Sequence, residues 1–118
     1  NFKPALSAPG GNILSVIPVP MGSYAVKSGT SMACPFAAGA AALLLQVKGK
    51  NPSVYRAARD LLQTTAVSVP NSLDEGSLPQ TLTQQGAGLI QVYDALYATT
   101  LVSPGHLVLN DTANYKPM

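Results

Sequence analysis

The sequence predicts an α/β fold class, with two short strands followed by three helices. Residues 12–19 are apolar and largely β-branched, and residues 22–29 follow them after a turn with a proline and a glycine. Residues 32–45 carry no charge, while residues 51–66 and 89–98 repeat apolar side chains at helical spacing. These patterns indicate an antiparallel pair of strands, one buried helix and two amphipathic helices.

Composition limits the chain to one modest domain. Of its 118 residues, 47% are apolar and only 10% are charged, which favours a core-rich piece over a solvated tail. The net charge of +2 comes from scattered basic residues rather than from a cluster. This distribution gives no reason to expect a nucleic-acid partner.

Cys34 is the only cysteine, so no disulfide can form within the chain and no site of paired cysteines exists. Free cysteine packs as a small hydrophobe, so we expect a free, buried thiol; a disulfide to a segment outside the chain is the alternative. We expect no metal site and no cofactor in this segment, which leaves open whether a longer parent protein binds calcium. The chain starts at Asn1 without a signal peptide, so we expect an excised piece of a longer protein.

The uncharged run from Met32 to Leu45 predicts a helix from Ser31 to about Gln46. Such a helix is apolar on every side, so we expect it to be largely buried in the parent domain. With 14 residues, the run is shorter than the about 20 residues that cross a bilayer, and we expect no membrane span.

The second helix has a clear start signal. Asn51 is a preferred N-cap residue, and Pro52 suits the first helical position. Residues 66–86 are rich in Ser, Pro, Gly, Gln and Asn and predict a long surface loop, after which residues 89–98 form the third helix. The pattern changes after Gly105, so we expect residues 1–105 to form one unit and residues 106–118 to begin another.

Ser31 has two interpretations on local chemistry. A serine hydroxyl becomes a good nucleophile when a base takes its proton and dipoles stabilise the oxyanion, and a helix N-terminus supplies such dipoles. Serine is also among the best N-cap residues, so Ser31 could simply cap the helix. Pro35 leaves the helix start open, because proline prefers the first helical position.

Four motifs in order resemble the subtilisin-like serine peptidases. The sequence "GTSMACPFAAGAAAL" is similar to the active-site segment of that family, and "KPALSAPGGNI" is similar to the segment before it. "ARDLLQTTA" and "QGAGLIQVYDAL" resemble the two segments that follow. The resemblance implies the C-terminal part of a catalytic domain with a mostly parallel central sheet, a buried active-site helix and surface helices.

The resemblance also implies a serine-type endopeptidase that acts on protein or peptide substrates. It makes Ser31 the acyl-forming nucleophile and its backbone N–H one oxyanion donor, with Gly29 and Thr30 in the active-site loop. The family's chain order is Asp, His, Ser, so the Asp, the His and the oxyanion Asn are expected before residue 1. Ala5 and Phe36 depart from the family pattern, which usually has aspartate and often histidine there.

The tail "LVLNDTANYKPM" resembles the first strand of the fibronectin-like β-sandwich that follows the catalytic domain in larger secreted members. Within it, Asn110 starts an Asn-Asp-Thr acceptor pattern, which makes it a candidate glycosylation site. We therefore expect a secreted or extracellular parent protein whose partners are its substrates and the upstream part of its own catalytic domain.

Two other functions remain open. An α/β-hydrolase would use Ser31 with His106 and one of Asp60, Asp74 or Asp94, because that fold places its acid and histidine after the serine. The second glycine of the G-x-S-x-G elbow is missing, however. Alternatively, the chain is a catalytically inactive fragment or pseudo-peptidase with a structural or binding role.

Overall fold

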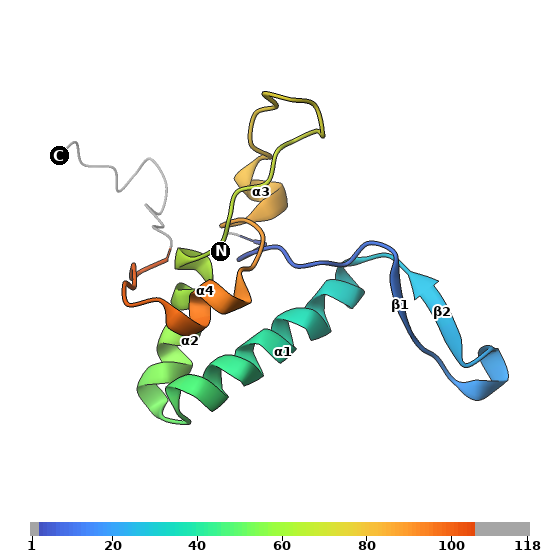
Figure 1. Cartoon of the computed structure of the whole chain (residues 1–118), viewed down its shortest axis with the longest axis horizontal. Coiled ribbons are helices and arrows are strands. Elements are labelled where there is room, and N and C mark those ends of the chain that lie inside the picture. The colour runs from blue at the N-terminus through green and yellow to red at the C-terminus, as the bar shows by residue number, and fades with distance from the viewer. Residues whose placement is uncertain (1–2, 106–118) are drawn as a thin grey trace, which may run out of the picture.

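The structure, a computed structural model, describes residues 3–105 and mixes helix with strand, which confirms the α/β class (Figure 1). Its elements, in chain order, are β1 (Ile13–Val16), a 3-10 turn (Val19–Met21), β2 (Tyr24–Lys27), α1 (Thr30–Lys48), α2 (Pro52–Thr64), α3 (Leu82–Gln85) and α4 (Val92–Tyr97). The hairpin projects from one end of α1, and α2 and α4 pack together near the other end (Figure 1).

The hairpin confirms the predicted antiparallel pair. Strand β1 pairs with β2 in a register that sets Ile13 opposite Lys27 and Val16 opposite Tyr24. Within residues 3–105 this is the only sheet, apart from isolated bridges such as the parallel one between Ser7 and Leu89. The parallel central sheet that the resemblance implies is therefore not formed by the described residues.

Helix α1 confirms the predicted helix, and it ends at Lys48, two residues beyond the expected end near Gln46. We expected it to be largely buried in the parent domain, but in this chain it is mostly exposed, since only Ala40 and Leu44 are buried. Helices α2 and α4 cover one side of it, and apolar side chains such as Phe36 and Leu43 stay in solvent. An uncharged, largely apolar run indicates that a helix suits an interior, but the covering elements must come from elsewhere.

The length of α1 also corrects the argument about membranes. The helix has 19 residues and is long and apolar enough to cross a bilayer, with 11% of its most apolar window buried. Length and composition alone do not distinguish such a helix from the core helix of a soluble protein.

Helix α2 follows its sequence pattern. The Asn51 side chain accepts a hydrogen bond from the Val54 N–H at 3.1 Å, which confirms the predicted N-cap. Leu61 and Leu62 are buried, while Arg56 lies exposed in solvent.

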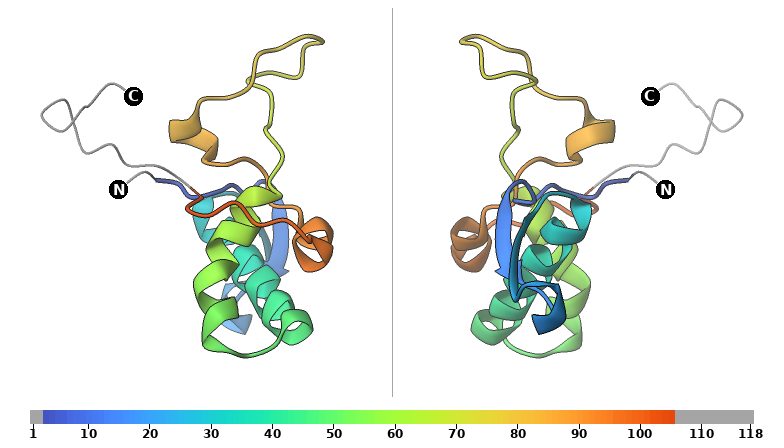
Figure 2. Two further views of the ribbon diagram at one scale, coloured as in Figure 1. Left: turned by 90° about the vertical axis from the view of Figure 1, so that its left-hand side faces the viewer. Right: turned by 90° about the vertical axis from the view of Figure 1, so that its right-hand side faces the viewer.

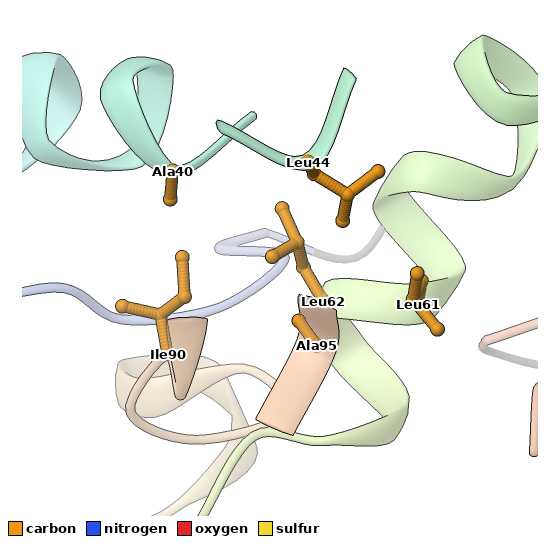
Figure 3. Close-up of a cluster of buried hydrophobic side chains, with 6 residues drawn as sticks. All are labelled: Ala40, Leu44, Leu61, Leu62, Ile90 and Ala95. Atoms are coloured by element: carbon orange, nitrogen blue, oxygen red, sulfur yellow. The ribbon is translucent and has the colours of Figure 1, made fainter. Parts of the chain in front are cut away.

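The core lies where three helices meet. Ala40 and Leu44 point from α1 toward side chains of α2, α4 and the segment before α4 (Figure 3). Six residues are buried there: Ala40, Leu44, Leu61, Leu62, Ile90 and Ala95. A core this small covers only a short stretch of α1, which explains why the rest of that helix remains open.

The segment predicted as a loop, residues 66–86, contains ordered structure. The buried Gln85 side chain accepts the Val69 N–H at 2.8 Å and donates to the Ser68 hydroxyl at 3.2 Å and the Gln80 carbonyl. The part beyond these contacts extends away from the helices (Figure 2). The third predicted helix begins only at Val92, because Leu89 forms backbone bridges instead.

Candidate active site

Ser31 is the second residue of α1, and its side chain is exposed. The N-cap position belongs to Gly29, whose φ of 154° and ψ of 167° favour a residue without a Cβ atom. The interpretation of Ser31 as the N-cap residue is therefore wrong.

The start of α1 leaves hydrogen-bond donors free. The Gly29 carbonyl accepts the N–H of Met32 at 3.0 Å and that of Ala33 at 3.4 Å. Within the described ranges, the backbone N–H groups of Thr30 and Ser31 and the Ser31 hydroxyl have no hydrogen-bond partner. Free N–H groups at a helix N-terminus carry partial positive charge, which suits a developing oxyanion beside Ser31.

Pro35 lies inside α1 rather than at its start, which resolves the open question about the helix boundary. An ordinary residue at position 35 would donate its N–H to the carbonyl of Ser31, four residues earlier. Proline has no such N–H, so the Ser31 carbonyl lacks its intrahelical donor. Neither the N–H nor the carbonyl of Ser31 therefore makes the regular hydrogen bond between residues four apart in a helix.

A cavity of about 260 Å³ lies along the first turns of α1. Its wall includes Thr30, Ala33 and Cys34 from the helix, together with part of the N-terminal segment from Pro4 to Ala8. The Cys34 thiol is free, as predicted, but exposed rather than buried. The segment from Pro4 to Ala8 lies against this side of α1 but leaves the cavity open, so the expected burial of Cys34 is not formed by residues 3–105.

The acids of the hydrolase hypothesis do not gather around Ser31. Asp60 lies on α2 and accepts a hydrogen bond from the Ser103 hydroxyl at 2.8 Å, and Asp94 lies on α4. Both helices pack at the far end of α1 (Figure 1). Asp74 lies in the extended loop, where it accepts a hydrogen bond from Ser72.

Two predicted residues, His106 and Asn110, lie outside the described residues, as does the proposed second unit at 106–118. In the part of the chain that the structure describes, no group of three or more His, Cys, Asp or Glu side chains could hold a metal ion.

Sequence analysis did not single out three residues that lie beside the start of α1: Gly10, Asn12 and Ser28. The Gly29 N–H donates to the Gly10 carbonyl at 2.8 Å, and the Asn12 N–H donates to the Ser28 hydroxyl at 2.8 Å. The turn signal Gly10-Gly11-Asn12 was visible in the sequence, but its contact with residues 28 and 29 was not.

Comparison with known proteins decides the family. Residues 1–88 match the model of the Subtilase family. The chain belongs to the subtilase family. The resemblance to the family is therefore confirmed, and the match includes Ser31 and the first three of the four motifs.

Relatives of this subtilase chain are much longer than it is. It is 43% identical over 110 residues to "Minor extracellular protease Vpr" of Bacillus subtilis (strain 168), covering 88% of this chain and 13% of Vpr. It is 37% identical over 110 residues to "PII-type proteinase" of Lactococcus lactis subsp. cremoris, covering 83% of this chain and 6% of that protein.

A solved structure supports the same assignment for the fold. The structure of Patellamide maturation protease PatA matches with a TM-score of 0.54 and 32% sequence identity. The match covers 75% of this chain and 31% of the PatA chain. The subtilase chain thus has the fold of part of a subtilisin-like protease.

Proposed function

We propose that this chain carries the nucleophile of a subtilisin-like serine endopeptidase, with Ser31 as the residue that attacks the peptide carbonyl. The observation that carries the proposal is the uncapped start of α1, where Ser31 is exposed and the N–H groups of Thr30 and Ser31 are free. Membership of the subtilase family and the names of the protease relatives support the reaction class.

In the proposed reaction, the Ser31 hydroxyl attacks the carbonyl carbon while a histidine takes its proton. The same histidine then protonates the leaving amine, and water cleaves the acyl-enzyme. The Ser31 N–H donates to the oxyanion, and the Thr30 hydroxyl assists. The histidine, its aspartate and the oxyanion asparagine are supplied by residues that precede this chain.

The substrates are proteins or peptides, and the parent protein is secreted. The name of Vpr as an extracellular protease supports the second point. Helix α1 is then the helix that carries the nucleophile in a subtilase domain rather than a membrane span, because its residues lie within the family match.

A fluorophosphonate probe tests the proposal on the full-length protein that contains this chain. We expect covalent labelling that mass spectrometry places on Ser31, loss of labelling in Ser31→Ala and unchanged labelling in His106→Ala. The 118-residue chain alone should not be labelled, because its serine lacks the base.

The alternatives give different results. An inactive fragment or pseudo-peptidase would leave the full-length protein unlabelled. A hydrolase that uses His106 would label the 118-residue chain and lose that labelling in His106→Ala.

A further inference from the structure

The two strands of the hairpin continue to contact each other up to the start of α1, but with a changed register. In the ladder, Ile13 is opposite Lys27, so a regular continuation would set Gly11 opposite Gly29. Instead, the Gly29 N–H donates to the carbonyl of Gly10 at 2.8 Å. The pairing is therefore offset by one residue, as in a β-bulge.

The Ser28 side chain contacts Asn12 at the position of this offset. Asn12 lies at the bulge with a φ of 52°, a conformation that asparagine tolerates better than most residues. Its N–H donates to the hydroxyl of Ser28 at 2.8 Å, and the same hydroxyl lies 3.4 Å from the Asn12 Oδ1 atom. We call these two contacts the Ser28–Asn12 clasp.

The clasp lies directly before the helix that carries Ser31. Ser28 precedes Gly29, whose carbonyl accepts the first hydrogen bonds of α1. Gly29 has no side chain that could cap the helix. On the opposite side of the contact, a Cβ atom added to Gly10 would lie 2.7 Å from the Gly29 oxygen and 3.1 Å from the Ala33 Cβ atom. The turn at Gly10 is thus packed closely against the first turn of α1.

We propose that the Ser28 hydroxyl is a positioning group for Ser31, an inference that rests on the proposed function. A side-chain cap at the N-cap position satisfies a backbone N–H group of the first helical turn, as Asn51 does in α2, and α1 has no such cap. We infer that the clasp and the Gly10–Gly29 hydrogen bond, which lie before the helix, orient its first turn instead. They hold the Gly29 peptide while leaving the N–H groups of Thr30 and Ser31 free for the oxyanion.

The test compares variants of the full-length protein that contains this chain. Ser28→Ala removes the hydroxyl, and we expect kcat to fall about tenfold with KM unchanged, because misplacing a reacting group lowers the rate of the chemical step. The rate of fluorophosphonate labelling should fall by a similar factor. Ser28→Thr keeps a hydroxyl and should restore most of kcat.

Two further variants separate positioning from general destabilisation. Asn12→Gly keeps the positive φ and the backbone N–H but loses the long contact with Oδ1, so kcat should fall less than in Ser28→Ala, whereas Asn12→Val opposes that φ and should behave like Ser28→Ala. Ser15→Ala is the matched control, since Ser15 is an exposed serine of β1 in the same hairpin. It should leave kcat unchanged.

The outcomes distinguish the inference from the proposed function. A wild-type protein that the probe does not label overturns the proposed function and the inference with it. A wild-type protein that is labelled and active, with Ser28→Ala within twofold of its kcat, overturns the inference alone. So does a loss confined to KM, or a Ser28→Thr variant as slow as Ser28→Ala.

Discussion

Helices α1 and α2 both carry a serine as their second residue, Ser31 and Ser53, but the two hydroxyl groups differ in their hydrogen bonds. In α2 the Ser53 hydroxyl donates to the Asn51 side chain, which also accepts the Val54 N–H. In α1 the N-cap is Gly29, which offers no side chain, and the Ser31 hydroxyl has no partner among the described residues. The serine of α2 belongs to a cap, and the serine of α1 is left available.

The two helices also differ in how their surfaces match their surroundings. Helix α2 buries Leu61 and Leu62 and exposes Arg56. Helix α1 carries no charged residue from Met32 to Leu45, yet it buries only Ala40 and Leu44. The core of this chain thus buries Leu61 and Leu62 of α2, whereas α1 has more apolar surface than the described residues cover.

The largest expected effect comes from replacing the two serines in the full-length protein. Ser31→Ala should lower peptidase activity by roughly 10⁴ to 10⁶, a range established for triad residues on subtilisin itself. Ser53→Ala should leave activity within about twofold, because that hydroxyl only supports a cap. Measured kcat/KM values for a peptide substrate decide between them, and equal losses in both variants would contradict the contrast between the helices.

Two neighbouring leucines of α1 should differ next most strongly in the 118-residue chain. Leu44 is fully buried and Leu43 is 48% exposed. Leu44→Ala should lower the free energy of unfolding by about 2–5 kcal/mol, and Leu43→Ala by less than about 1 kcal/mol. Urea denaturation followed by circular dichroism measures both losses. Similar losses would show that the exposed side of α1 is covered in solution.

The cap of α2 should contribute a smaller amount. Asn51→Ala removes the acceptor for the Val54 N–H and should cost about 1 kcal/mol in urea denaturation. Asn51→Asp keeps an acceptor and should retain most of the stability. Asn71→Ala is the control, because Asn71 is an exposed loop residue. A cost for Asn71→Ala as large as that for Asn51→Ala would contradict the capping role.

The smallest expected effect concerns Cys34. Because its thiol is exposed in this chain, Cys34→Ser should change the free energy of unfolding by less than about 0.5 kcal/mol. A thiol reagent should label Cys34 without denaturant. In the full-length protein, where we expect α1 to be covered, labelling should require denaturant. Slow labelling in the 118-residue chain would mean that its α1 surface is already protected.

Local patterns were sufficient for several elements. The hairpin follows from two short apolar segments around a turn, and the start of α2 follows from Asn51 and Pro52. These features depend on residues that are neighbours in sequence, so backbone preferences and hydrogen bonds within a few residues decide them. The motif around Ser31 was likewise sufficient to identify the family and the candidate nucleophile.

Tertiary structure alone decided which surfaces are buried and how α1 begins. The uncharged sequence of α1 predicted burial, but burial of Cys34 or Leu43 requires covering elements that α1 does not itself encode. The extended backbone at Leu89 arises from its bridges to Ser7 and Val67, which override the helical spacing of the residues around it. The contact of Ser28 with Asn12 joins residues sixteen positions apart. Such features depend on contacts between distant segments, whose energies local propensity does not contain.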